Sequence, residues 1–227
     1  MSPPSSSTQA PDGEQLLRFD VIERTAHWLT ALCFLTLIFT GAALYIPAVI
    51  SLIGRRALVE RIHVDVGLAL MLPLIVSLAG SWGKGLRADL SRINRWNAGD
   101  RQWLRLTLRR QPTGGVPVGK FNAGQKLNGA ITAGVMLVML GTGSVMHWPY
   151  YWPLSWRTGA TFTHEVISLV FVVVVVGHIG MALTHPPALR SMFTGRVSRA
   201  WARHHAPAWL EDLEQGTQQK DQPSLTG

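Results

Sequence analysis

The chain contains almost no cysteine and lacks the motif that attaches a haem covalently. Its one cysteine, Cys33, lies inside the first apolar run, so the 227 residues can form no disulfide bond among themselves. No Cys-x-x-Cys-His sequence occurs, which excludes c-type haem attachment. Residues 1–15 also lack a basic segment followed by a short apolar core, and we therefore expect a disordered tail there rather than a cleaved signal peptide.

Charged side chains are scarce in four apolar stretches that are each long enough to cross a bilayer. A transmembrane helix needs about 20 apolar residues, and the four stretches cover residues 26–47, 63–82, 125–147 and 163–185. Pro73 allows a kink inside the second stretch. We predict an all-α membrane protein, with a four-transmembrane-helix bundle inside a domain of residues 16–213 and a polar C-terminal tail at 214–227.

The segments between these stretches are expected to lie at the membrane surface. Residues 83–124 form the longest connection, which is rich in arginine, and we expect an interfacial amphipathic helix around 99–110. Residues 16–25 and the basic segment that ends near Leu213 are expected to be amphipathic too. Residues 148–162 are expected to form an aromatic loop in the headgroup layer.

The distribution of lysine and arginine predicts the orientation of the bundle. The N-terminal segment, the 83–126 connection and the C-terminal tail together hold 17 of these residues, whereas the other two loops hold 4. The positive-inside rule then predicts a multi-pass membrane protein whose termini and long connection are cytoplasmic. The net charge of +8 is therefore expected to face lipid headgroups and the cytoplasm rather than nucleic acid.

The fourth stretch carries two histidines with an informative spacing. His164 and His178 are 14 residues apart. On a helix they therefore project within about 40° of each other and lie about 21 Å apart along the axis. One helix thus presents an imidazole near each membrane face, as is needed to hold two flat cofactors one above the other.

Two further histidines complete a pair at each depth. In the predicted topology, His63 opens the second span on the outer side, near His164, and His27 opens the first span on the inner side, near His178. Two trans imidazoles give a six-coordinate haem iron that is suited to electron transfer and has no open position for a substrate. The pattern predicts two b-type haems, and the alternative for each histidine is an ordinary hydrogen bond between helices.

Four other histidines lie outside these two pairs. His147 ends the third span and could replace either outer ligand. His185 could replace His178, although the proline that follows it favours the water interface. His204 and His205 belong to the basic tail and are expected at the surface.

Arginines and glycines near the two depths offer weaker signals. The arginines that could pair with haem propionates, or only anchor helix ends, are Arg24, Arg61 and Arg157. Gly41 lies 14 residues after His27, and Gly129 and Gly143 are also 14 apart, so a macrocycle could approach these helices closely. Small residues are equally common wherever membrane helices pack.

The stretch VGKFNAGQK at residues 118–126 places polar groups at the mouth of the third span. Asn122 and Gln125 flank a small-residue turn that includes Gly124. Amide and backbone donors there could bind the carbonyl of a quinone near the inner haem. The alternative is a helix N-cap at Asn122 followed by an interfacial lysine, Lys126.

With these residues in hand, the chain resembles the gamma subunit of membrane-bound respiratory formate dehydrogenases, a four-helix di-haem cytochrome b. The resemblance covers roughly residues 18–212. It is carried by RFDVIERTAHWLTA around His27, RIHVDVGL around His63, THEVISL around His164, GHIGMAL around His178, GKFNAGQK before the third span and RHHAPAWL in the tail.

The resemblance implies roles for particular residues. It implies that His63 and His164 hold the outer haem iron and that His27 and His178 hold the inner one. It also implies that the quinone site, for menaquinone or ubiquinone, lies in the stretch with Asn122, Gly124 and Gln125.

The resemblance further implies partners. These are an iron–sulfur beta subunit on the outer face and, through it, a molybdenum- or tungsten-dependent catalytic alpha subunit, with a higher oligomer of the complex as a further option. The chain would then be no enzyme by itself but the quinone-reducing, electron-transfer subunit of the complex.

Two other interpretations remain. Related four-helix cytochromes serve hydrogenase and sulfur-compound reductase complexes, so the electron donor could differ. A small histidine-lined membrane transporter is the alternative from another class. The apolar middle of each span and the lack of a repeated pair of broken helices argue against the transporter.

Overall fold

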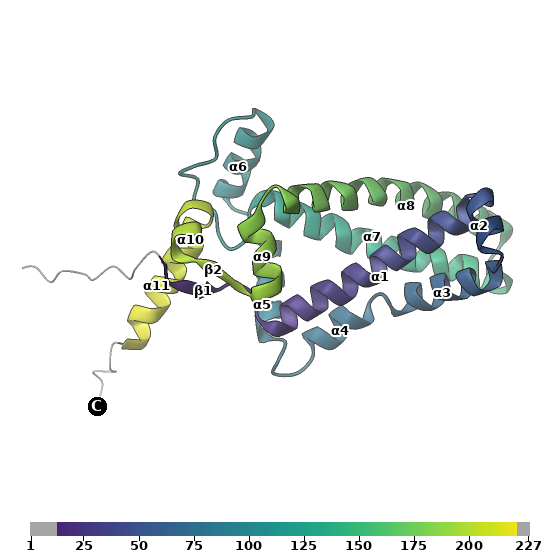
Figure 1. Cartoon of the computed structure of the whole chain (residues 1–227), viewed down its shortest axis with the longest axis horizontal. Helices are drawn as coiled ribbons and strands as arrows, with labels where there is room; N and C mark the ends of the chain where they lie inside the picture. Colours follow the sequence, from purple (N-terminus) through teal and green to yellow (C-terminus); the bar gives the residue numbers. More distant parts are fainter. Residues whose placement is uncertain (1–12, 222–227) are drawn as a thin grey trace, which may run out of the picture.

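Four long apolar helices dominate the computed structural model, which describes residues 13–221. They are α1 (Val21–Tyr45), α3 with α4 (Arg56–Ala69 and Leu72–Leu78), α7 (Ala123–His147) and α8 (Leu154–Leu183). They run along the long axis of the molecule, with α1 packed on α3 and α4, and α7 packed on α8 (Figure 1). Each is long and apolar enough to cross a membrane, which confirms the predicted four-helix membrane fold.

All four spans begin earlier than the sequence suggested, with α3 at Arg56 rather than 63 and α7 at Ala123 rather than 125. Helix α1 starts at Val21 rather than 26, because Asp20 and Glu23 form a capping box. The Glu23 N–H donates to Asp20 Oδ1 (2.8 Å), and the Asp20 N–H donates to Glu23 Oε2 (2.6 Å). Helix α8 starts at Leu154 rather than 163, directly after Pro153, so residues 154–162 are helical and the prediction of a loop across 148–162 was wrong for them. Only the short helix η1 (Pro149–Tyr151) and its flanks remain as the loop.

The second span is interrupted near the proline that the sequence singled out. Helix α3 ends at Ala69, and α4 begins at Leu72 with Pro73 in its first turn. Proline has no N–H to donate and its ring clashes with the preceding turn, so the helix breaks there and restarts. Helix α4 then ends at Leu78, four residues before the predicted end of this span at residue 82.

Different short helices flank the two ends of the bundle. Helix α2 (Pro47–Ile53) and the start of α3 lie at one end, called here the α2 end (Figure 1). The opposite end, called the terminal end, carries α5 (Lys84–Asn94), α6 (Ala98–Leu108) and α9 (Pro186–Thr194). Helix α6 occupies the region where an interfacial helix was expected, whereas α5 was not predicted.

A small β-ribbon ties the two ends of the chain together, which no sequence pattern predicted. Strand β1 (Gln15–Leu17) pairs antiparallel with β2 (Arg196–Ser198), with Leu16 opposite Val197. Gly195 ends α9 at a φ of 79°, and its carbonyl accepts the N–H groups of Arg18 (2.7 Å) and Phe19 (3.0 Å). Strand β1 lies in the segment that was expected to be an amphipathic lead-in.

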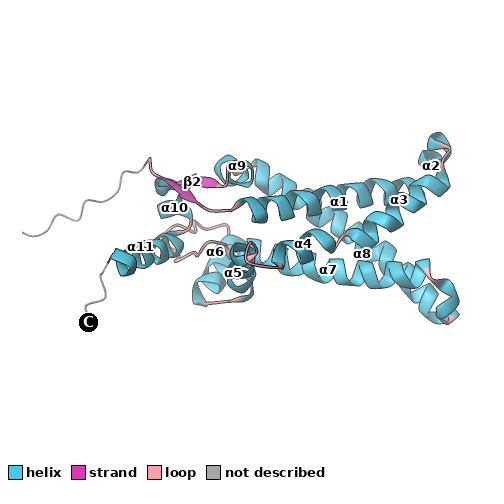
Figure 2. Ribbon diagram, turned by 90° about the horizontal axis from the view of Figure 1, so that it is seen from below, coloured by secondary structure: helices cyan, strands magenta, loops and turns pink. Residues whose placement is uncertain are grey.

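The C-terminal segment folds beside this ribbon, away from the membrane helices (Figure 2). Helices α10 (Arg199–His205) and α11 (Pro207–Asp221) pack a small apolar core against β2. The core consists of Val197, Ala202, Ala206, Trp209 and Leu210. The predicted polar tail at 214–227 is helical up to Asp221, while its last six residues and residues 1–12 of the predicted disordered tail lie outside the described residues.

Buried ion pairs hold the terminal end together. The Lys120 ammonium lies 3.3 Å from Glu23 Oε1 of α1 and also pairs with Asp89 of α5; all three side chains are buried. The Arg18 guanidinium is also buried and donates to the Lys120 carbonyl (3.2 Å). Burial lowers the pKa of the Arg18 guanidinium to about 10, against the opposing effect of Asp89, so the group stays charged at neutral pH.

A second buried pair joins α6 to α7. The Lys126 ammonium lies 2.7 Å from Asp100 Oδ2 and donates to the Arg95 carbonyl (2.8 Å). Both basic residues of the GKFNAGQK stretch are therefore internal links between helices.

Lys120→Met should destabilise the protein, because it leaves the buried Glu23 carboxylate without a cation and leaves Asp89 with Arg92 as its only ion-pair partner among the described residues. Removing one partner of a buried ion pair costs about 3–5 kcal/mol. Denaturant unfolding of the purified chain in detergent, followed by circular dichroism, measures the loss. Lys84→Met at an exposed position of α5 is the matched control and should change the free energy of unfolding little. Equal effects of the two substitutions would contradict this account of the cluster.

Candidate functional site

The structure brings the four predicted histidines together as two pairs, one near each end of the bundle. The outer pair consists of His63 on α3 and His164 on α8, with ring centroids 6.3 Å apart and planes at 68°. The inner pair consists of His27 on α1 and His178 on α8, with centroids also 6.3 Å apart and planes at 55°. The partners of each pair come from different helices, and α8 contributes to both.

The spacing within each pair fits a metal ion between two imidazoles. A bond of about 2 Å from metal to nitrogen, with about 1 Å more to each ring centre, separates two trans rings by about 6 Å. Both pairs lie close to that separation. A direct hydrogen bond between two imidazoles, with the nitrogens about 2.9 Å apart, would bring the ring centres to about 5 Å, closer than the 6.3 Å observed, and no such bond is present among residues 13–221. The residues thus fit a haem iron held by two histidines at each depth.

The outer histidines have hydroxyl partners that the sequence analysis missed. Thr40 Oγ1 lies 2.8 Å from His63 Nδ1, and Thr142 Oγ1 lies 2.9 Å from His164 Nδ1. The inner pair is surrounded differently. Asn128 Nδ2 is 3.5 Å from His178 Nδ1, at the limit of a hydrogen bond. The only sequence signal for the threonines is that each directly precedes a glycine already noted.

Two of the noted glycines make room for the outer imidazoles. A Cβ on Gly41 would lie 3.3 Å from His63 Cε1, and a Cβ on Gly143 would lie 3.4 Å from His164 Cε1. These two glycines therefore leave space for the imidazole rings of His63 and His164, whereas the sequence suggested space for a macrocycle. Gly129, by contrast, faces Ile93 of α5, at 3.4 Å from the same kind of added atom.

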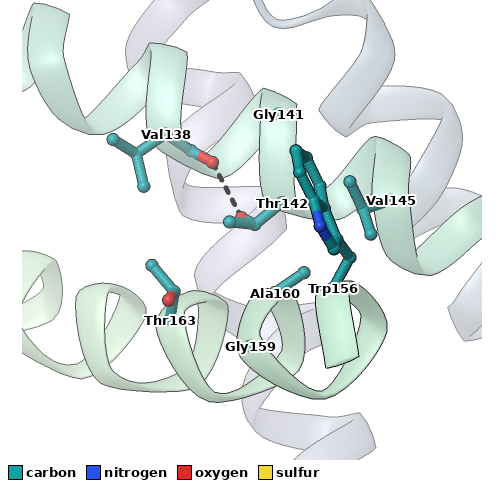
Figure 3. Close-up of a pocket in the computed structure, with 8 residues that line it drawn as sticks. All are labelled: Val138, Gly141, Thr142, Val145, Trp156, Gly159, Ala160 and Thr163. Atoms are coloured by element: carbon teal, nitrogen blue, oxygen red, sulfur yellow. Dashed lines mark hydrogen bonds between the residues drawn. The ribbon is translucent and has the colours of Figure 1, made fainter. Parts of the chain in front are cut away.

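A groove opens beside the outer pair, between α7 and α8 (Figure 3). It has a volume of about 380 Å³ and is lined mainly by small and apolar side chains. Its lining residues are Val138, Gly141, Thr142, Val145, Trp156, Gly159, Ala160 and Thr163. Figure 3 shows the Thr142 hydroxyl directed at the Val138 carbonyl, at 2.7 Å, so Thr142 stands between the groove and His164.

The other histidines lie apart from both pairs. His147 is exposed at the end of α7, edge-on to Trp148. His185 Nδ1 is 2.9 Å from the Met181 carbonyl oxygen, just after α8. His205 stacks on Trp201 of α10 with its ring plane at 9° to the indole, and His204 is next to it.

The three arginines noted in the sequence take part in local contacts. Arg61 pairs with Asp65 at 3.6 Å on an exposed face of α3, and Arg157 is exposed near the start of α8. Arg24 donates to the Asp20 carbonyl (3.2 Å) and to that of Phe193, and so ties α1 to α9.

The NAGQK stretch begins α7 with a complete capping box. The Gln125 N–H donates to Asn122 Oδ1 (2.9 Å), and the Asn122 N–H donates to Gln125 Oε1 (3.0 Å). Gly124 lets α6 approach, since a Cβ there would lie 3.2 Å from the Trp103 ring. The N-cap that was the alternative interpretation is therefore present, and it uses only the oxygen atoms of the two amides.

Gly41→Ala and Gly143→Ala should each displace an outer imidazole, because the added methyl meets Cε1 at 3.3–3.4 Å, and each should lower the haem content if this pair holds a haem. The absorbance of bound haem per purified chain checks this. Gly141→Ala is the control. Gly141 lies on α7 like Gly143, and its added Cβ would have no atom within 4 Å, so this variant should keep the full haem content. A smaller loss in Gly143→Ala than in Gly141→Ala would refute the proposed contact.

Comparisons with known proteins agree with this geometry. The chain is 24% identical over 221 residues to the cytochrome b556(Fdn) subunit of the nitrate-inducible formate dehydrogenase of Escherichia coli strain K12, covering 92% of this chain and 96% of that one. It is 27% identical over 214 residues to the cytochrome b556(fdo) subunit of formate dehydrogenase from the same organism, covering 91% and 97%. The cytochrome b556 subunit of formate dehydrogenase from Haemophilus influenzae is 23% identical over 215 residues, with 91% and 87% covered.

A family model gives the assignment. The model for prokaryotic cytochrome b561 matches residues 18–195, which is most of the chain and includes all four spans and all four paired histidines. Both the match and the arrangement of apolar helices around facing histidines lead to one conclusion: the chain belongs to the prokaryotic cytochrome b561 family.

Proposed function

We propose that this protein is the membrane-bound electron-transfer subunit of a formate dehydrogenase complex and passes electrons through two haems to a quinone. The observation that carries this proposal is the pair of facing histidines at each of two depths, both with ring centroids 6.3 Å apart. The similarity to cytochrome b556 subunits of formate dehydrogenases supports the choice of complex.

The four paired histidines would hold two b-type haems. His63 and His164 would bind the outer haem, and His27 and His178 the inner one. A haem with two imidazole ligands exchanges single electrons and offers no open position to a substrate. His164 and His178 lie about 21 Å apart along α8, so the two haems they would hold would span most of a hydrocarbon layer of about 30 Å.

The quinone would bind at the terminal end, beside the inner haem. The capping box leaves the NH₂ groups of Asn122 and Gln125 as free donors at the start of α7, among the described residues. Asn128 contacts His178 and lies three residues after Gln125, so the two amides share a helix face. These donors, together with the turn at Gly124, suit a carbonyl of menaquinone or ubiquinone.

The charge of the two ends indicates which side of the membrane each partner would occupy. The arginine-rich terminal end would face the cytoplasm, as the positive-inside rule indicates. The α2 end would then face the periplasm of a bacterial inner membrane and receive electrons from an iron–sulfur subunit, which is itself joined to a molybdenum- or tungsten-dependent catalytic subunit. On this proposal the chain transfers electrons and oxidises no formate itself.

A haem count on ligand variants tests the assignment. The purified chain should contain two b haems by pyridine haemochrome, and His27→Ala and His164→Ala should each lose mainly one, because each removes one axial ligand of one iron. His147→Ala and His185→Ala remove histidines outside the pairs and should keep both haems. A well-folded chain without haem would refute the proposal, and loss of a haem from either control would reassign a ligand.

The quinone site is tested by substitutions that spare the helix cap. Asn122→Asp and Gln125→Glu keep the capping oxygens and remove the NH₂ donors, so they should slow oxidation of the reduced haems by a quinone analogue several-fold at unchanged haem content. Asn97→Asp makes the same change in the capping box of α6 and serves as the control. Wild-type rates in both α7 variants would remove these amides from the site.

A further inference from the structure

Both outer histidines are hydrogen-bonded in the same way by a threonine of a neighbouring membrane helix. Thr40 of α1 lies 2.8 Å from His63 Nδ1, and Thr142 of α7 lies 2.9 Å from His164 Nδ1. The two contacts come from different helices and reach different ligands. Their close agreement in distance and in chemistry points to a shared role.

The direction of these bonds can be deduced from the second contact of each hydroxyl. Thr40 Oγ1 donates to the Thr36 carbonyl at 2.7 Å, and Thr142 Oγ1 donates to the Val138 carbonyl at 2.7 Å. A hydroxyl has one proton, and here the helix carbonyl four residues earlier takes it. The oxygen must therefore accept the N–H of the imidazole. Both rings are thus fixed as the Nδ1–H tautomer, with Nε2 left unprotonated.

Each threonine acts together with the glycine that follows it. The Thr40–Gly41 pair meets His63, and the Thr142–Gly143 pair meets His164. The glycine lets the ring approach the helix backbone, while the hydroxyl of the residue before it binds the approaching N–H. Position and tautomer of each ring are therefore determined by two adjacent residues of one helix.

The inner pair lacks this arrangement. Among residues 13–221, His27 makes no hydrogen bond through its ring nitrogens, and His178 has only the 3.5 Å contact with the Asn128 amide. The two depths of the bundle thus offer the same kind of ligand with different support. Outer ligands donate a short hydrogen bond through Nδ1–H, and inner ligands do not.

We propose that Thr40 and Thr142 are positioning residues that hold the outer ligands in the Nδ1–H tautomer and lower the midpoint potential of the outer haem. This inference rests on the proposed function, since it assumes the outer haem. A hydrogen bond donated from Nδ1–H raises the basicity of Nε2, which favours the oxidised iron. With weaker hydrogen bonds at the inner pair, transfer from the outer to the inner haem becomes more favourable.

The test is a redox titration of Thr40→Val and Thr142→Val in the purified chain, which remove the hydroxyl at nearly constant volume. Each should raise the potential of the outer haem, with at least a threefold change in its reduction equilibrium. At 59 mV per tenfold change for one electron, this corresponds to about 30 mV. The same substitutions in a His27→Ala background, which should retain only the outer haem, assign the shift. Thr40→Ser and Thr142→Ser keep the hydroxyl and should restore the wild-type potential.

Matched controls separate the hydroxyl's effect on the ligand from its effect on the helix. Thr36→Val on α1 and Ser144→Ala on α7 remove hydroxyls that bond only to helix carbonyls, Leu32 at 2.9 Å and Leu140 at 2.7 Å. They should leave both potentials unchanged. Loss of the outer haem in the valine variants that serine restores would also support the proposal.

Three outcomes would overturn the inference. They are unchanged potentials in the valine variants, equal shifts in the control variants, and failure of serine to restore the wild-type behaviour. A wild-type chain with fewer than two haems is a different result, because it would refute the proposed function itself. The haem count of the wild type therefore distinguishes the two failures before any variant is titrated.

Discussion

An imidazole in a hydrocarbon layer needs a polar partner for each of its two ring nitrogens, and the arrangement of this bundle follows from that requirement. An unpaired polar group costs several kcal/mol where no water can replace its partner. At the outer depth, a threonine satisfies Nδ1 of each histidine, and the remaining Nε2 atoms have no protein partner among the described residues. A metal ion between rings 6.3 Å apart would satisfy both of these nitrogens at once.

At the terminal end, buried polar groups are satisfied by ion pairs. Three capping boxes begin α1, α6 and α7 there, and two of their acidic members also form ion pairs, Glu23 with Lys120 and Asp100 with Lys126. Glu23 lies one helical turn before His27, on the same face of α1. The ion pair between Glu23 and Lys120 therefore holds the first turns of α1, from which His27 projects.

The sequence predicted the four spans and indicated which histidines would pair, because hydropathy and a 14-residue spacing are visible along the chain. It did not reveal the β-ribbon, since Gln15–Leu17 is too short for a strand pattern and its partner is about 180 residues away. Thr40 and Thr142 also escaped notice, because a hydroxyl in a membrane helix usually bonds only to its own backbone. The start of α8 was missed because its first turns, with Arg157 and two threonines, are polar in sequence and exposed in the structure.

The same 14-residue interval recurs on the two antiparallel helices that meet most closely. On α8 it separates His164 from His178, and on α7 it separates Asn128, which contacts His178, from Thr142, which contacts His164. Because the interval returns nearly the same helix face after almost four turns, each ligand of α8 faces its own supporting residue on α7. A substitution of either support can therefore alter one depth without moving the other, and the two sites can differ in chemistry although they share a helix.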